Sequence, residues 1–177
     1  MTGFTGAGKS TAIDCVVNAG IGERVYLGQI VLDAIAGRGL DNTGENQRLV
    51  RTELRQIHGE DYLFAASCPR IDAFLSNGRI AMVDAVLSAV ENSYLRQRYP
   101  EAYRLVHVQA PLAMRAERLL ERSLGKTNLD DVMKRDQLER EKLEIEVVFN
   151  CADLRIDNDG TYAQLLERLM AGLSLFS

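Results

Sequence analysis

The sequence predicts a three-layer α/β domain with a mostly parallel sheet and helices on both faces. Short β-rich runs alternate with longer helical ones along the chain, without an internal repeat or a low-complexity tract. The run from Ile80 to Val86 is almost continuously apolar, with Asp84 as its only carboxylate. Such a run is typical of a strand covered on both faces, as in parallel sheets. We therefore predict that residues 1–177 form a single domain.

The periodicity of the apolar residues predicts the individual elements. Strands are expected at 24–27, 80–86, 105–108 and 154–156. Helices are expected at 11–20, 29–36 and 162–173, with a further helix capped by Thr43. A helical stretch at 60–76 contains Pro69, so a kink or break is expected near Ser67 and Cys68.

Composition excludes several classes of protein. Apolar residues make up 46% of the chain and charged residues 26%, with a formal net charge of -4. This charge gives no reason to expect nucleic-acid or membrane binding. We find no apolar run long enough to span a bilayer and no secretory signal. The three cysteines are isolated in the sequence, so we expect them to be reduced and to behave as small apolar residues. Reduced cysteines favour a cytoplasmic protein.

The N-terminal segment carries the spacing G-x-x-x-x-G-K-S of a P-loop, a phosphate-binding loop. Its glycines let the backbone curl so that successive N–H groups surround an anion, and the following helix directs its positive end at the same phosphates. Lys9 is expected to reach the β- and γ-phosphates of ATP, and the Ser10 hydroxyl to ligate Mg²⁺. The predicted ATP-binding residues are Gly3-Phe4-Thr5-Gly6-Ala7-Gly8-Lys9-Ser10-Thr11.

Asp84 is the second candidate functional residue. It lies at the end of an apolar strand, where ligands of open α/β sheets collect. A carboxylate there can hold Mg²⁺ or help to deprotonate an acceptor hydroxyl. The alternative is an ordinary aspartate that caps the helix beginning near Ser88.

Arginines are dense after the third predicted strand. Arg118 and Arg122 are four residues apart on one helical face, Arg115 precedes them, and Arg135 follows. Guanidinium groups suit the neutralisation of a transferring phosphoryl group, so we predict a helical lid at approximately 115–145 that closes over the nucleotide. Interleaved acidic residues leave a solvated charged face as the alternative.

A buried strand should precede a P-loop, yet only Met1 and Thr2 stand before Gly3. The expectation is a truncated first strand, whose remainder lies upstream of Met1. A chain that begins at Met1 is expected to have poor stability.

The P-loop, the strand-end Asp84 and the arginine-rich segment follow one another in an order and spacing that resembles the nucleoside-monophosphate-kinase-like branch of P-loop proteins. This branch includes adenylate kinase and dephospho-coenzyme A kinase. More closely, the chain resembles a mainly archaeal group of small P-loop ATPases related to both. The resemblance covers nearly the whole chain, and the P-loop is its most specific part. The matching stretches are 2–11, 27–28, 38–40, 82–88, 115–118 onward, 135–136, 152–153 and Asn158.

The chain departs from that group at three positions. Gln29 stands where the group has an aspartate, Ala85 where it has a glycine, and Leu87 where it has an arginine. These departures fall where the resemblance places the second substrate.

The preferred hypothesis is an ATP- and Mg²⁺-dependent phosphotransferase that acts on a nucleotide or nucleotide-like small molecule. Arg38, Arg51 and Arg55 lie in the segment where such kinases bind the acceptor, and they are candidates for its phosphate. Lys9, Asp84, Arg118 and Arg122 are the predicted catalytic residues, assisted by Arg115 or Arg135. Two alternatives remain open, a nucleotide-dependent regulatory ATPase and a nucleotide-binding module without turnover.

Overall fold

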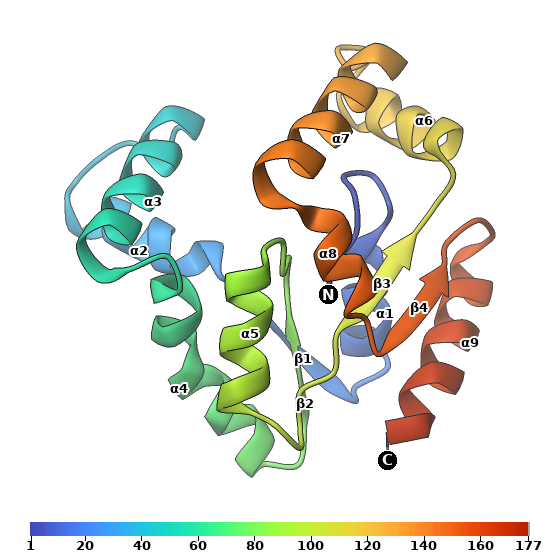
Figure 1. Cartoon of the computed structure of the whole chain (residues 1–177), viewed down its shortest axis with the longest axis horizontal. Helices are drawn as coiled ribbons and strands as arrows, with labels where there is room; N and C mark the ends of the chain where they lie inside the picture. The colour runs from blue at the N-terminus through green and yellow to red at the C-terminus, as the bar shows by residue number, and fades with distance from the viewer. Residues whose placement is uncertain (177) are drawn as a thin grey trace.

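The computed structural model describes residues 1–176 and alternates parallel strands with helices (Figure 1). Each predicted strand and helix is present, within a few residues of its expected bounds. The strands are β1 (Gly22–Val25), β2 (Ile80–Val83), β3 (Val106–Gln109) and β4 (Leu154–Asp157). The helices are α1 (Lys9–Asn18), α2 (Gly28–Gly37), α3 (Gly44–His58), α4 (Tyr62–Ser76), α5 (Ala89–Arg98), α6 (Leu112–Arg122), α7 (Leu129–Leu143), α8 (Ile145–Asn150), α9 (Tyr162–Leu173) and the 3₁₀ helix η1 (Ser174–Phe176).

Met1 and Thr2 occupy the central position of the sheet. β1 pairs with β2, and β3 pairs with β4, both in parallel. Thr2 donates its N–H to Val106 O at 2.8 Å and accepts from Val108 N at 3.0 Å. On the other side, Met1 N donates to Val83 O at 2.8 Å. The spatial order is therefore β1, β2, residues 1–2, β3, β4, with the P-loop leaving the middle of the sheet.

A cavity of about 430 Å³ lies beside Met1, between β2 and the start of β3. Its lining includes Ile80, Met82 and Val106 from those strands. Within the described residues, Met1 and Thr2 hold the central position of the sheet.

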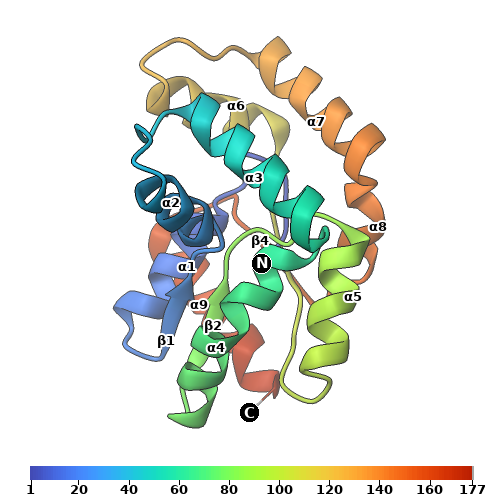
Figure 2. The same ribbon diagram turned by 90° about the vertical axis from the view of Figure 1, so that its left-hand side faces the viewer.

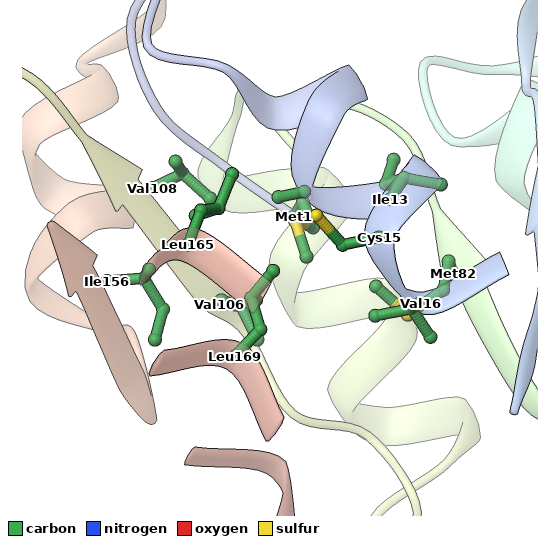
Figure 3. Close-up of a cluster of buried hydrophobic side chains, with 11 residues drawn as sticks. Met1, Ile13, Cys15, Val16, Met82, Val106, Val108, Ile156, Leu165 and Leu169 are labelled. Atoms are coloured by element: carbon green, nitrogen blue, oxygen red, sulfur yellow. The ribbon is translucent and has the colours of Figure 1, made fainter. Parts of the chain in front are cut away.

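Two helical layers cover the sheet, which confirms the predicted three-layer α/β fold. On one face, α1 and α9 pack against Met82, Val106 and Ile156 from three strands (Figure 3). On the other face, α4, α5 and α8 enclose a second core that includes Val25 and Leu105. The sheet is therefore buried between helices, and the P-loop is fixed between two packed layers.

Two helical groups extend beyond the sheet. α2 and α3 pack on the start of α4 around Val31, Val50 and Leu63. The other group, α6 and α7, lies over the ends to which the arrows of β3 and β4 point (Figures 1 and 2). These two helices cover most of the segment, approximately 115–145, for which a helical lid is predicted, and we refer to them as the lid. Among the described residues, no helix combines the length and the apolar character that a membrane crossing requires.

The expected break at Pro69 was wrong, because α4 runs as one helix from Tyr62 to Ser76. Two side chains in the turn before the proline add hydrogen bonds within the helix: Ser67 Oγ donates to Leu63 O at 2.7 Å and Cys68 Sγ to Phe64 O at 3.3 Å. Both residues and Phe64 are buried, so tertiary packing holds the helix through the proline. The predicted cap of α3 is confirmed, since Thr43 Oγ1 accepts from Asn46 N.

Candidate functional site

The predicted phosphate-binding segment forms a tight loop between the central sheet position and the N-terminus of α1. Gly3 and Gly8 have φ angles of 143° and 97°, a region that only glycine adopts readily. A Cβ atom on Gly3 would lie 2.2 Å from Val108 O, and one on Gly8 would lie 2.0 Å from Asn158 Nδ2. Both glycines are therefore required by conformation and by space. We refer to residues 3–10 as the cradle.

Lys9 folds back over the cradle. Its ammonium group donates to Gly3 O at 2.6 Å and to Phe4 O at 3.1 Å. Burial lowers the pKa of Lys9 below its usual value, whereas the carboxylates of Glu139 and Asp84 oppose this shift. The structure therefore brings Lys9 and Asp84, which are far apart in the sequence, into one electrostatic environment. Thr11, the last predicted ATP-binding residue, lies exposed in the first turn of α1.

Ser10 and Asp84 are linked through Arg24, which the sequence did not single out. Arg24 donates to the backbone oxygen of Ser10 at 3.0 Å, and its other terminal nitrogen lies 3.8 Å from Asp84 Oδ2. Asp84 directly follows β2, as predicted, and its side chain is 14% exposed. It does not cap the next helix, because Ser88 and Glu91 form that capping box. Arg24 thus joins the Ser10 backbone to the Asp84 carboxylate, and a serine hydroxyl and a carboxylate are hard oxygen donors of the type that Mg²⁺ takes.

Ala85 stands in the left-handed region with φ 58°. The family resemblance implies a glycine at this position, a residue without the steric penalty of a Cβ. Near it, Leu87 N donates to Glu91 Oε2 at 2.7 Å. Gln29 Nε2 donates to Asp33 Oδ1 at 2.8 Å, so the amide is engaged within α2.

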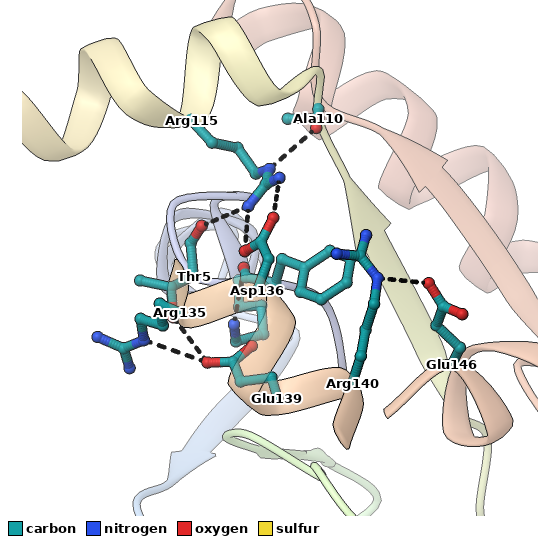
Figure 4. Close-up of polar contacts among 10 residues, drawn as sticks. Thr5, Ala110, Arg115, Arg135, Asp136, Glu139, Arg140 and Glu146 are labelled. Atoms are coloured by element: carbon teal, nitrogen blue, oxygen red, sulfur yellow. Dashed lines mark hydrogen bonds and ion pairs between the residues drawn. The ribbon is translucent and has the colours of Figure 1, made fainter. Parts of the chain in front are cut away.

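Arg115 is a buried structural link between the lid and the cradle (Figure 4). Its guanidinium donates to both carboxylate oxygens of Asp136, at 2.9 and 2.6 Å, and to Thr5 O at 3.2 Å. Phe4 lies beneath it, with the Arg115 and Arg140 cations 5.1 and 4.7 Å from the ring centroid. The sequence predicted that Arg115 assists phosphoryl transfer, and the structure engages all of its nitrogens with protein oxygens.

The other predicted lid arginines differ in position. Arg118 donates to Asn158 O at 3.0 Å, and Asn158 in turn donates its side-chain amide to Ala7 O at 2.8 Å. Arg118 therefore lies close to the cradle, and its second terminal nitrogen is buried without a partner among the described residues. Arg122 is exposed at the end of α6 and forms no ion pair within residues 1–176. The structure brings Arg118, but not Arg122, into contact with a residue that supports the loop.

A pocket of about 850 Å³ opens beside Asp84. It is lined at the same time by Arg51 and Arg55 from α3, by Leu63 and Phe64 from α4, and by Asp84. Arg55 is paired with the buried Glu91 at 3.1 Å, whereas Arg51 forms no ion pair in the described part of the chain. Arg38, the third predicted acceptor residue, does not line this pocket. It pairs instead with Glu53 on the surface of α3.

Two residues of the site, Arg24 and Glu139, were not found from the sequence, and Asn158 was named only as a position that matches the related group. Arg24 lies in a strand, and Asn158 follows one, so their spacing carried no motif. Glu139 lies in a run of alternating charges that is typical of a solvated helix face. Its carboxylate nevertheless accepts from the Thr5 hydroxyl of the cradle at 3.2 Å.

Solved structures with similar folds include three bacterial proteins. The TT1252 protein of Thermus thermophilus aligns with a TM-score of 0.61 and 20% identity, over 99% of this chain and 95% of that one. A dephospho-CoA kinase from Campylobacter jejuni aligns with a TM-score of 0.56 and 15% identity, covering 99% of this chain and 96% of that one. A gluconokinase from Sinorhizobium meliloti aligns with a TM-score of 0.52 and 13% identity, covering 98% and 89%. At these identities the likeness shows the fold, which is that of P-loop kinases.

Sequence relatives come from archaea, as the resemblance implied. No family model matches the chain. A UPF0200 protein of Halobacterium salinarum is 32% identical over 157 residues, which are 88% of this chain and 81% of that protein. A UPF0200 protein of Thermococcus onnurineus is 32% identical over 90% of this chain and 86% of its own length. The chain also matches a UPF0200/UPF0201 protein of Archaeoglobus fulgidus at 28% identity and spans about half of it, 52%. The chain belongs to the UPF0200 family and has a P-loop kinase-like fold.

Proposed function

We propose that the protein is an ATP- and Mg²⁺-dependent phosphotransferase whose acceptor is a nucleotide or nucleotide-like small molecule. The observation that carries this proposal is the pocket that runs from Asp84, beside the cradle, to Arg51 and Arg55 on α3. A loop that only binds a nucleotide does not need a second pocket at its reacting end. A phosphotransferase needs one, because it must hold donor and acceptor together.

The proposed nucleotide half is built on the cradle. Backbone amides from Thr5 to Ser10 and the Lys9 ammonium would hold the phosphates, once Lys9 exchanges its present carbonyl partners for phosphate oxygens. Ser10 and Asp84 would hold Mg²⁺, which neutralises charge on the phosphates. Arg118 lies near the cradle through Asn158 and would add a further positive group.

The proposed acceptor half combines apolar and charged walls. Tyr26 and Val90, both exposed, offer an apolar surface for a ring or chain, and Arg51 offers a cation for an anionic group. Arg55 is held by Glu91, so its main role would be to shape this wall. Asp84 reaches both halves and would accept the proton of an acceptor hydroxyl.

A coupled assay tests the proposal. Mg·ATP is offered with a panel of nucleoside monophosphates and with dephospho-coenzyme A, and transfer is expected to at least one of them. The variant Arg51→Ala should raise KM for that acceptor about tenfold while leaving the affinity for ATP unchanged. Arg48→Ala is the matched control, because Arg48 is an exposed arginine of α3 outside the pocket.

The same assay separates the alternatives. Measurable ATP binding without transfer to any acceptor would contradict the phosphotransferase. Hydrolysis that needs no acceptor and rises with a partner protein would instead favour a regulatory ATPase. Binding without any hydrolysis would favour a module without turnover.

A further inference from the structure

A carboxylate of the lid lies against the cradle. Glu139, on α7, accepts from Thr5 Oγ1 at 3.2 Å and from Arg135 Nε at 3.1 Å through the same oxygen, Oε1 (Figure 4). Its side chain is only 13% exposed, although both of its neighbours on α7, Leu138 and Arg140, are exposed. Glu139 therefore points inward from a helix face that is otherwise solvated.

This carboxylate lies within electrostatic range of the Lys9 ammonium at the cradle. Its second oxygen, Oε2, is buried and has no hydrogen-bond partner among the described residues. The nearby Lys9 ammonium is held by Gly3 and Phe4 carbonyl groups instead. A buried carboxylate oxygen without a donor is costly, and the positive charge of the nearby Lys9 ammonium reduces that cost.

The position of α7 does not depend on Glu139. One turn earlier, Asp136 is bound at both oxygens by the buried Arg115. At the adjacent position, the Arg140 cation lies over the Phe4 ring. The helix is thus fixed on the cradle by other contacts, and the Glu139 side chain can leave by a rotamer change while α7 stays in place.

We propose that Glu139 is an internal anion that competes with nucleotide phosphates for the cradle, and that Arg135, once released from Glu139, becomes a phosphate-binding residue. Arg135 is 62% exposed and anchored through Nε, so both of its terminal nitrogens are free to turn toward an incoming oxyanion. The inference rests on the proposed phosphate-binding role of the cradle. It adds that Glu139 lowers the affinity for nucleotide and that Arg135 raises it.

Removing the charge of Glu139 tests the first part. Glu139→Gln retains an acceptor for the Thr5 hydroxyl and loses the negative charge, so ATP should bind about tenfold more tightly. The gain should fall from ATP to ADP to AMP, because it scales with the phosphate charge near the cradle. Affinities are measured by titration calorimetry with Mg²⁺ present. Glu121→Gln, an exposed change of equal charge on α6, should leave all three affinities unchanged.

Removing the cation tests the second part. Arg135→Gln should weaken ATP binding, and it should do so by at least as large a factor in the Glu139→Gln background, where no ion pair has to break before Arg135 reaches the phosphates. Unchanged or weaker ATP binding in Glu139→Gln would overturn the proposal. An effect of Arg135→Gln that vanishes in the double variant would overturn the role of Arg135.

These outcomes differ from a failure of the proposed function. If ATP binds and Glu139→Gln tightens it without any transfer to an acceptor, the competition stands and the phosphotransferase fails. If Lys9→Ala abolishes ATP binding while Glu139→Gln changes nothing, only the competition fails.

Discussion

At the residue scale, the backbone of Ala85, directly after Asp84, is in a strained left-handed conformation. Ala85 has φ 58°, a conformation in which a Cβ crowds the following carbonyl oxygen. The turn that it makes takes the chain from β2 to the cap at Ser88 and leaves Asp84 facing the pocket. The steric strain at Ala85 therefore lies in the turn that orients Asp84 toward the pocket.

Ala85→Gly should stabilise the protein. Glycine adopts this φ without a steric penalty, which outweighs its larger entropy in the unfolded chain, so the free energy of unfolding should rise by about 1 kcal/mol. Urea denaturation measures it. Ala36→Gly, an exposed change within α2, should act in the opposite direction by up to about 1 kcal/mol. A less stable Ala85→Gly would show that the left-handed turn is not strained.

The residues that local rules govern were predictable. Lys9 and Ser10 follow from the spacing of the loop, and Asp84 follows from the end of an apolar strand. Arg24 and Glu139 were missed because their roles exist only through contacts across the fold. The sequence does not show whether a charged residue such as Glu139, within a run of other charged residues, directs its side chain inward or toward solvent.

At the element scale, one buried ion pair joins α7 to α6, and its arginine also reaches the cradle. The side chains of Arg115 and Asp136 are 6% and 4% exposed, and the same guanidinium reaches Thr5 O. The predicted lid at approximately 115–145 spans most of α6 and all of α7, which are helical as expected. Helical periodicity could not show that Arg115 would be bound by Asp136 and Thr5 and so hold α7 in place. The break expected in α4 failed for a related reason, because packing overrode the local preference at Pro69.

Breaking this pair should be costly. Arg115→Met leaves the Asp136 carboxylate buried without its partner, so the free energy of unfolding should fall by about 3–5 kcal/mol. The measurement is urea denaturation followed by circular dichroism. Arg98→Met breaks the exposed Arg98–Asp72 pair and should cost less than about 1 kcal/mol. Equal costs for the two variants would contradict the structural role of Arg115.

At the scale of the whole molecule, the site lies where three parts of the chain meet. The sheet and its two helical layers hold the cradle, α3 and α4 supply the pocket wall, and α6 and α7 close over the loop. The layered architecture followed from the alternation of strands and helices. The meeting of Asp84 with Arg51 and Arg55 did not, since no local pattern relates β2 to α3.

The most direct test of this account is ATP binding by the cradle itself. Calorimetric titration with Mg·ATP compares the wild type with Lys9→Ala, and with Lys126→Ala as an exposed control in the lid loop. We predict saturable binding to the wild type and to Lys126→Ala, and no detectable binding to a folded Lys9→Ala. Wild-type affinity in Lys9→Ala would contradict the assignment of residues 3–10 as a nucleotide site.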